Sequence, residues 1–204
     1  MAINYTIHAQ VIDITTDTPK PEDVFLVDTN VWYWMTYPNA ISFVPNQLSE
    51  YPGYLNKALG IHSRIHHSGL SLAELAHLIE RTEREIYEKT VGQIKPKEYR
   101  HNLAAERSRV FSEIQAAWGQ VTALADPLTV TIDGQTTAAA LNRFKTEKVD
   151  GYDLFILESM KNHGVVQVIT DDGDFATVPG IQVFTANRNV ISAARSQGKR
   201  VNRL

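Results

Sequence analysis

Short apolar runs alternate with helical patterns along the chain. Val24–Val27, Val165–Ile169 and Ile181–Phe184 have the length of strands and are bounded by polar or turn-forming residues, so they predict buried β-strands. The loosely alternating stretch Tyr5–Ile14 could add an edge strand, and Leu128–Ile132 a further short strand. Strands that alternate with helices predict an α/β fold, in which helices cover both faces of a parallel sheet.

Helices are predicted where apolar residues recur every three or four positions between capping signals. The longest expected helix opens at Ser71, and Gly164 would close another as a left-handed cap residue. Because Tyr37–Gly60 is interrupted by prolines and glycines, we expect a surface segment there with at most one short helix. The predicted helices lie at Val31–Met35, at 71–92, after Pro96, at Ala138–Phe144, at 150–163 and from Asn189 onward.

The composition favours one soluble domain. A length of 204 residues with 43% hydrophobic residues allows one core. We expect an N-terminal extension over residues 1–23 and a domain over residues 24–204, with an insertion at about 37–68 and a basic segment at 188–204. No apolar run approaches the roughly 18 residues of a membrane span, and Met1–Gln10 lacks the blocks of a signal peptide. We therefore expect a cytoplasmic protein without membrane contact.

Acidic side chains follow two of the predicted strands. Asp28 ends the first apolar run, and Asp171, Asp172 and Asp174 follow the run that begins at Val165. Open α/β sheets bind ligands at the carboxyl ends of their strands. Two carboxylates about 4 Å apart repel each other by on the order of 4 kcal/mol, so a convergent set needs a cation. The chain has no cysteine, and carboxylates favour hard ions such as Mg²⁺ or Mn²⁺.

Each acid also has an ordinary structural interpretation. Asp28 could cap the helix that follows it. Ser71–Glu74 matches a capping box, in which the glutamate reaches back to the cap amide. Asp153 could complement the dipole of a helix that begins at Asp150, and Asp171–Asp174 could be a solvated turn. Taken one at a time, Asp28, Glu74 and Asp153 favour the structural interpretation, whereas Asp171–Asp174 favour it less, and no single acid decides between structure and function.

The joint order of the motifs resembles the PIN-domain nucleases, which include the VapC-type toxins of bacterial toxin–antitoxin pairs. The resemblance runs from Val24 to Phe184. In its third motif this chain has Leu154 and Phe155 where the family often has small residues, and Asp171 occupies a variable position that we expect to face solvent. The four motifs are Leu26–Asn30, Ser71–Leu75, Tyr152–Ile156 and Ile169–Phe175.

The resemblance implies a three-layer α/β/α sandwich and a ribonuclease that hydrolyses phosphodiester bonds of single-stranded or structured RNA. Metal ions, Mg²⁺ or Mn²⁺, would activate the attacking water. The resemblance also implies a toxin role with an antitoxin partner, and a homodimer. Asn30 and Thr170 would position water or ligands through hydrogen bonds. The implied metal ligands are Asp28, Glu74, Asp153 and Asp172, with Asp174 as a further acidic member.

Substrate phosphates require cations beside such an acidic site. The tail from Arg188 to Leu204 has five basic residues and no acid, although each could equally be a solvated surface residue. Trp32, Tyr33 and Trp34 could stack on unpaired bases, but we expect at least two of the three in the core. The candidate phosphate contacts are Arg188, Arg195, Lys199 and Arg200, with Lys95, Lys97 and Arg100 as second choices.

Several alternatives to a PIN nuclease stay open. A haloacid-dehalogenase-like phosphatase also begins with a strand that ends in Asp, but it needs a second Asp where this chain has Asn30. A calcium loop at Asp171–Asp174 lacks the terminal glutamate of an EF-hand. His62 and His66 have the i, i+4 spacing of a zinc pair on a helix, without a third ligand at firm spacing. A catalytically weak PIN-like scaffold that binds RNA or protein is the non-enzymatic alternative.

Overall fold

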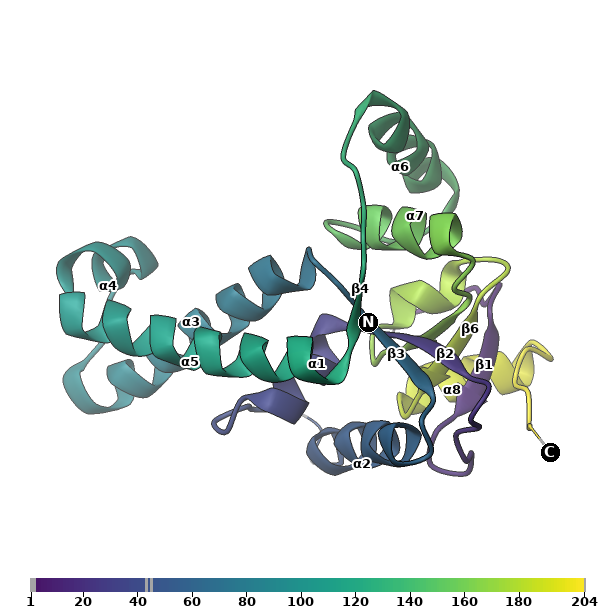
Figure 1. Ribbon diagram of the computed structural model, residues 1–204, viewed down its shortest axis with the longest axis horizontal. Helices are drawn as coiled ribbons and strands as arrows, with labels where there is room; N and C mark the ends of the chain where they lie inside the picture. The colour runs from purple at the N-terminus through teal and green to yellow at the C-terminus, as the bar shows by residue number, and fades with distance from the viewer. Residues whose placement is uncertain (1–2, 43, 45, 204) are drawn as a thin grey trace.

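The computed structural model describes residues 3–42, 44 and 46–203. Residues 1–2, 43, 45 and 204, which fall in the expected extension, insertion and basic segment, lie outside the described part. The strands are β1 (Gln10–Asp13), β2 (Val24–Val27), β3 (Arg64–Ser68), β4 (Asp126–Leu128), β5 (Gln167–Ile169) and β6 (Gln182–Thr185). The described strands form one six-stranded parallel sheet in the order β1-β6-β5-β2-β3-β4 (Figure 1).

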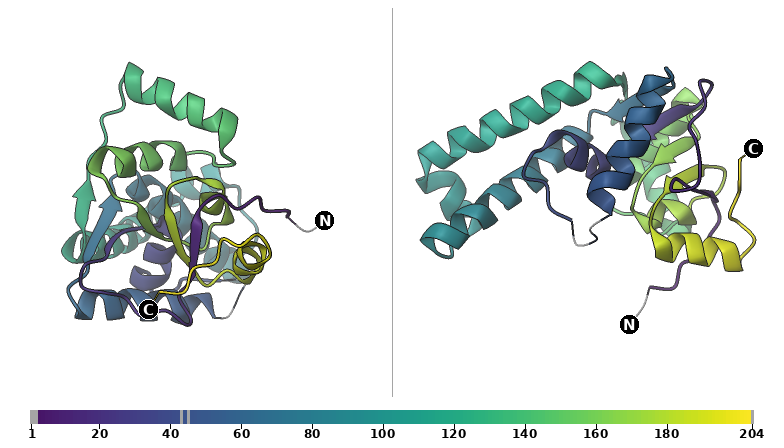
Figure 2. Two further views of the ribbon diagram at one scale, coloured as in Figure 1. Left: turned by 90° about the vertical axis from the view of Figure 1, so that its right-hand side faces the viewer. Right: turned by 90° about the horizontal axis from the view of Figure 1, so that it is seen from below.

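Helices cover both faces of this sheet, which confirms the predicted α/β/α sandwich (Figure 2). They are α1 (Thr29–Thr36), α2 (Gln47–Gly60), α3 (Ser71–Val91), α4 (Pro96–Asn102), α5 (Ala104–Leu124), α6 (Gly134–Thr146), α7 (Asp153–His163) and α8 (Arg188–Ser196), with a short 3₁₀ helix at Gly173–Thr177. Gly164 ends α7 with φ of 67°, the predicted left-handed cap.

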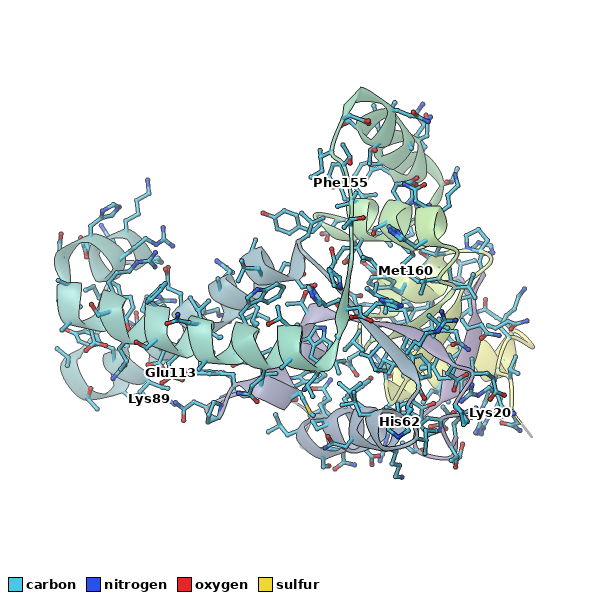
Figure 3. All side chains as sticks on the ribbon, viewed as in Figure 1. Lys20, His62, Lys89, Glu113, Phe155 and Met160 are labelled. Carbon is cyan, nitrogen blue, oxygen red and sulfur yellow. The ribbon has the colours of Figure 1, made fainter. Side chains whose placement is uncertain are left out.

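Alternation along the strands divides the core into two layers. Phe25 and Val27 point to the face that α1, α2 and the inner ends of α3 and α5 cover. Leu26 points to the opposite face, where Met160 packs from the sheet side of α7 (Figure 3). On that same face α8 lies beside Val11 of the edge strand, and α6 packs on α7. The short apolar runs are therefore buried on both sides, as parallel strands require.

Helices α3 and α5 project from the sheet as an arm (Figure 1). The helix expected after Pro96 is interrupted at Leu103, where φ is −115° and ψ is 79°, so that α4 forms the tip and α5 returns. Val110 of α5 is buried, as its place on the predicted apolar stripe suggests. Phe111, which we expected on the same stripe, is 60% exposed. No helix in the described part of the chain combines the length and apolarity that a membrane span needs.

The prediction that Tyr37–Gly60 is a surface segment is wrong. Most of it is the 14-residue helix α2, which buries Tyr51, Tyr54 and Leu55 in the core between α1 and the sheet. The prolines and glycines suggested an irregular loop, yet Pro52 lies inside the helix. An interior proline costs about 3 kcal/mol, and burying three large apolar side chains at roughly 2 kcal/mol each outweighs that cost.

Strand β3 was missed, and β4 begins earlier than expected. The sequence Arg-Ile-His-His-Ser of β3 has one aliphatic residue, but the strand is hydrogen-bonded between β2 and β4. β4 shares only Leu128 with the expected strand Leu128–Ile132. His62 lies at the end of α2 in a left-handed turn (Figure 3) and His66 lies on β3, so these described residues do not form the helical zinc pair.

The N-terminal segment and the basic tail complete one edge of the sheet. β1 pairs with β6, as the edge strand expected within Tyr5–Ile14. On the outer edge of β1, the amide of Val11 donates to the carbonyl of Lys199 at 2.9 Å, and the carbonyl of Val11 accepts from the amide of Val201 at 2.8 Å. Arg203 then binds Asp17 at 2.5 Å and Asp23 at 2.6 Å, and its guanidinium lies 4.6 Å from the centre of the Phe184 ring. Extension and tail are therefore structural parts of the domain.

Replacement of Arg203 by alanine is expected to destabilise the fold strongly. The Asp17 and Asp23 side chains are each 4% exposed, so the change leaves two buried carboxylates without their cationic partner. Breaking a buried ion pair costs about 3–5 kcal/mol in the free energy of unfolding, which urea denaturation measures. Arg195→Ala, at an exposed arginine of the same segment, should stay within about 0.5 kcal/mol of wild type. Equal effects of the two substitutions would contradict this role.

Candidate active site

The path of the chain through the sheet reverses between β2 and β5. These strands are neighbours, but the chain continues from β2 to β3 on one side and from β5 to β6 on the other. They end at the same edge, where Val27 is paired with Ile169. Such a reversal opens a crevice at the carboxyl ends of the strands. The polar residues that follow Val27 and Ile169 therefore meet across it.

Asp28 stands at the centre of this crevice and is 6% exposed. Its Oδ1 accepts a hydrogen bond from the amide of Thr29 at 2.6 Å, so it caps α1. Its Oδ2 accepts from the hydroxyl of Thr170 at 2.7 Å. Capping and a place in the site are thus compatible roles of one carboxylate.

Thr170 links the two strand ends. Its hydroxyl donates to Asp28 and also accepts from the backbone amide of Asp172 at 2.9 Å. Asp172 in turn accepts from the amide of Asp174 at 2.9 Å, which starts the 3₁₀ helix. Because its hydroxyl is engaged on both sides, Thr170 positions two carboxylates, whereas we had expected it to position water or ligands.

Glu74 lies in the first turn of α3 and faces Asp28 rather than its own helix end. The predicted capping box is wrong: in the described residues the cap of α3 is Leu70, without a side-chain cap hydrogen bond. Instead, the hydroxyl of Thr29 donates to Oε2 of Glu74 at 2.5 Å. This contact brings the second motif to the first, which the sequence pattern of Ser71–Glu74 did not indicate.

Asp153, the first residue of α7, comes from the opposite side and is 9% exposed. Its amide donates to the carbonyl of Asp150 at 3.1 Å. Asp150 lines the crevice as well, as does His77 of α3, and sequence reasoning assigned neither to the site. The signal for Asp150 was its position three residues before Asp153, which we interpreted only as a helix start.

Asp171 corrects another expectation, because it is half-buried and its carboxylate is hydrogen-bonded to protein groups. Its carboxylate accepts from the hydroxyl of Tyr51 at 2.6 Å and from the side-chain amide of Gln47. Its carbonyl accepts from the side-chain amide of Asn187 at 2.8 Å. Asp171 therefore joins α2 and the start of α8 to the rim of the crevice.

The acids of the site share one cavity of about 510 Å³, and among its described lining residues there is no lysine or arginine. Burial is the main cause that raises the pKa of Asp28 and of Asp153, and the negative charges of their neighbours raise both further. Burial also raises the pKa values of Glu74 and Asp172. The predicted residues that line this cavity are Asp28, Asn30, Glu74, Asp153 and Asp172.

Asp174 lies farther out than the other acids. It does not appear among the described residues that line the cavity. Burial, followed by the charges of Asp172 and Asp150, raises its pKa to about 6. Its backbone supports the loop, because its amide binds Asp172 and its carbonyl accepts from Thr177 at 2.7 Å.

The donor chemistry of the cavity suits a divalent cation. Five carboxylates, with no lysine or arginine among the described lining residues, provide the hard oxygen ligands that Mg²⁺ and Mn²⁺ prefer. Within the described part of the chain, no three histidine or acidic side chains already converge closely enough to hold an ion. The chemistry and the charge of these residues therefore suit a divalent metal ion. Their side chains, however, are not arranged closely around a single ion position.

The predicted phosphate contacts are dispersed. Arg188 lines a neighbouring hollow together with Asp171. Of the four candidate phosphate contacts in the tail, it is the one placed at the rim of the crevice. Arg200 pairs with Asp13 at 3.3 Å, while Arg195 and Lys199 are exposed. Lys95, Lys97 and Arg100 lie at the far tip of the arm, with Arg100 paired to Glu80 (Figure 1). Arg81 was missed, although it follows Glu74 by two helical turns and so shares its face of α3.

Comparisons with known proteins identify the family. A model of the PIN domain matches residues 25–181, and the chain belongs to the PIN domain family, as the sequence motifs predicted. PIN domains are generally nucleases. The chain is also similar to a solved structure titled "Structure of FitAB bound to IR36 DNA fragment", with 19% identity and a TM-score of 0.43 over 81% of this chain and 96% of that one. No curated protein matches the chain.

Asp153→Asn is expected to raise the melting temperature of the metal-free protein. The substitution keeps the shape of the side chain and removes a carboxyl group whose pKa is raised to about 9 by burial and by neighbouring negative charges, so folding at neutral pH no longer has to protonate this side chain. A gain of 1 kcal/mol corresponds to about 2–4 °C in a domain of this size, measurable by circular dichroism in EDTA. Glu22→Gln, at an exposed acid before β2, should leave the melting temperature unchanged. A lower melting temperature for Asp153→Asn would refute the unfavourable placement of this carboxyl group.

Proposed function

We propose that this PIN-domain protein is a metal-dependent ribonuclease that hydrolyses phosphodiester bonds of RNA. The observation that carries the proposal is the cavity at the strand reversal, which five carboxylates line and which has no lysine or arginine among its described lining residues. Asp28, Glu74, Asp153 and Asp172 would hold Mg²⁺ or Mn²⁺, and Asp150 and Asp174 add negative charge nearby. RNA as the substrate follows from the resemblance to the VapC-type toxins.

When bound, the ion supplies a water of lowered pKa and offsets the charge that develops on the phosphate. In the hydrolysis the water oxygen bonds to phosphorus, and the bond from phosphorus to the leaving ribose oxygen breaks as that oxygen gains a proton. The hydrogen bonds from Thr29 and Thr170 hold Asp28 in one orientation. Asn30 lines the cavity and offers an amide to orient the water or the phosphate. No histidine or lysine base is required in this scheme.

The first test separates the ligands from the residue that positions them. Short single-stranded RNA should be cut with Mn²⁺ or Mg²⁺, and EDTA or Asp28→Asn should abolish the cutting. Thr170→Val should lower kcat about 10- to 100-fold, because it frees Asp28 and Asp172 from their shared hydroxyl, whereas Thr170→Ser should retain activity. Single-stranded DNA of the same sequence tests the preference for RNA.

Activity that survives both EDTA and Asp28→Asn would overturn the mechanism. The second candidate function is an RNA-binding or protein-binding scaffold of weak activity. The observation that favours it is that no three described ligands converge in advance on an ion site. Retained RNA binding without cleavage at any metal concentration would support the scaffold over the nuclease.

The proposal extends to a toxin role, with a small antitoxin protein as partner and a homodimer as the active form. Induced expression of the chain in bacterial cells should then stop growth. Asp28→Asn should relieve the arrest at equal protein level, because toxicity would depend on cleavage of RNA. Growth that continues with active wild-type enzyme would indicate a housekeeping nuclease.

A further inference from the structure

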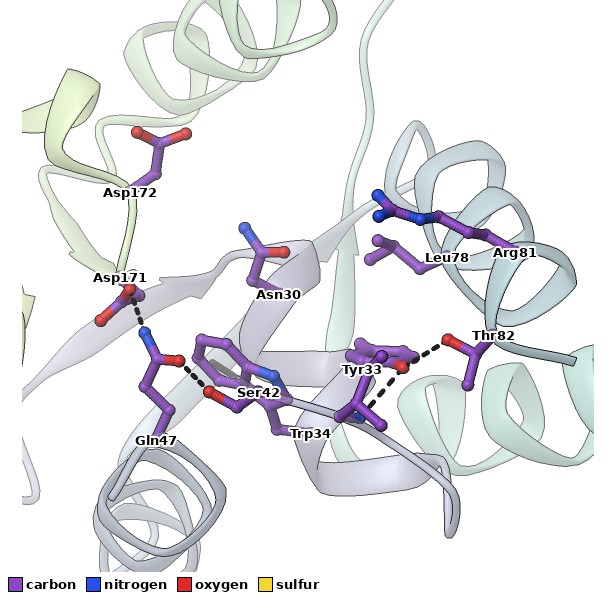
Figure 4. Close-up of a pocket in the computed structure, with 11 residues that line it drawn as sticks. Asn30, Tyr33, Trp34, Ser42, Gln47, Leu78, Arg81, Thr82, Asp171 and Asp172 are labelled. Atoms are coloured by element: carbon purple, nitrogen blue, oxygen red, sulfur yellow. Dashed lines mark hydrogen bonds between the residues drawn. The ribbon is translucent and has the colours of Figure 1, made fainter. Parts of the chain in front are cut away.

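A second pocket adjoins the acidic cavity. It has a volume of about 290 Å³ and shares Asn30, Leu78 and Asp172 with that cavity, so the two hollows are continuous. Figure 4 shows Asn30 between Asp172 on one side and Leu78 and Arg81 on the other. A group seated in this pocket would thus lie beside whatever occupies the acidic cavity.

Trp34 and the more deeply buried Tyr33 both line this pocket, and Trp34 is the more exposed of the two aromatic residues. Of the three aromatic residues after Asp28, Trp32 and Tyr33 are buried, as predicted, whereas Trp34 is half-buried and lines the pocket. Its ring rests on that of Tyr51, with centres 5.2 Å apart and planes tilted by 35°. Tyr51 is itself fixed by its hydrogen bond to Asp171, so the indole has a supported orientation.

The remaining lining combines apolar walls with polar edges. Leu78 and Ile41 supply aliphatic surface, and Asn30, Ser42 and Gln47 supply amide and hydroxyl groups. A volume of 290 Å³ is at the lower end of ligand pockets, which suits one planar group rather than a chain of them. Amphipathic rings with hydrogen-bonding edges match this mixture of surfaces.

The charges decide which part of a nucleic acid could enter. Asp171 and Asp172 lie in the wall and would repel a phosphate, but an uncharged base meets no such penalty. Arg81 lines the pocket with a side chain that is 57% exposed, and its contact within the described residues is the hydrogen bond from its Nε–H to Glu85, at 2.9 Å. Its terminal guanidinium nitrogens are therefore placed to meet a phosphate outside the pocket.

We propose that this Trp34 pocket holds an unpaired nucleobase next to the phosphate that is cut. The inference rests on the proposed nuclease function and narrows its substrate to RNA that is single-stranded at the cleavage point. A base in a duplex lies within its stack and cannot enter the pocket, whereas an unpaired base can stack on an aromatic ring.

The test measures binding without cleavage, by fluorescence anisotropy of a labelled RNA of ten nucleotides in EDTA and an Asp28→Asn background. Stacking of one base contributes about 1–3 kcal/mol, so Trp34→Ala should weaken binding about 5- to 100-fold. Trp34→Phe should recover most of this loss, while Trp34→Leu, which keeps apolar bulk without a π-face, should not. Circular dichroism checks that each variant is folded.

A second comparison uses the protein with its pocket intact. The same strand without bases should bind as weakly as intact RNA binds to Trp34→Ala, and duplex RNA should not respond to the Trp34 substitutions. Equal binding of strands with and without bases would overturn the inference. Equal cleavage of duplex and single strands by the wild type would overturn it while the nuclease stands. Base-dependent binding without any cleavage would instead refute the nuclease and retain the pocket.

Discussion

Five carboxylates line one crevice, and the rest of the structure has to hold them there against burial and their mutual repulsion. Burial and the negative charges of neighbouring residues raise the pKa of Asp28 and of Asp153, so keeping these groups ionised in the crevice is unfavourable. The register of β2 and β5 brings Asp28 and Asp172 to one edge, and the hydroxyl of Thr170 bridges them. Apolar packing on both faces of the sheet offsets the cost. An ion that neutralises the cluster would therefore stabilise the fold as well as supply chemistry.

Helix α2 connects the core to the Trp34 pocket. The hydroxyl of Tyr51 donates to Asp171 and accepts from the amide of Ala186 at 2.9 Å, while its ring supports Trp34. Burial and the charge of Asp171 raise the pKa of Tyr51, which keeps its hydroxyl protonated as a donor. At the start of α2, Gln47 also binds Asp171 and lines the Trp34 pocket. A segment that looked like a surface insertion thus shapes the surface on which a substrate would lie.

The basic tail has a different role from the one its charge suggests. A run of arginines and lysines without an acid is what nucleic-acid contacts require, but charge along the sequence does not say which acids lie opposite it in space. Arg203 is bound to Asp17 and Asp23, and Arg200 to Asp13, so these two cations close the sheet edge. Deleting the tail would therefore disturb the fold, and single substitutions are the informative changes.

The sequence by itself determined local elements of structure and the residues that belong to the motifs. Apolar runs such as Val24–Val27 identify strands, and acids placed directly after them must lie at the carboxyl edge of a parallel sheet. The strand order, the contact between Thr29 and Glu74, and the burial of Tyr51 were decided by tertiary structure. The physical reason is that these features depend on residues distant in sequence, which compete with local propensity and can prevail over it. The hydroxyl of Thr29, 45 positions before Glu74, binds the Glu74 carboxylate where a capping box could have formed, and core packing outweighed the one proline inside α2.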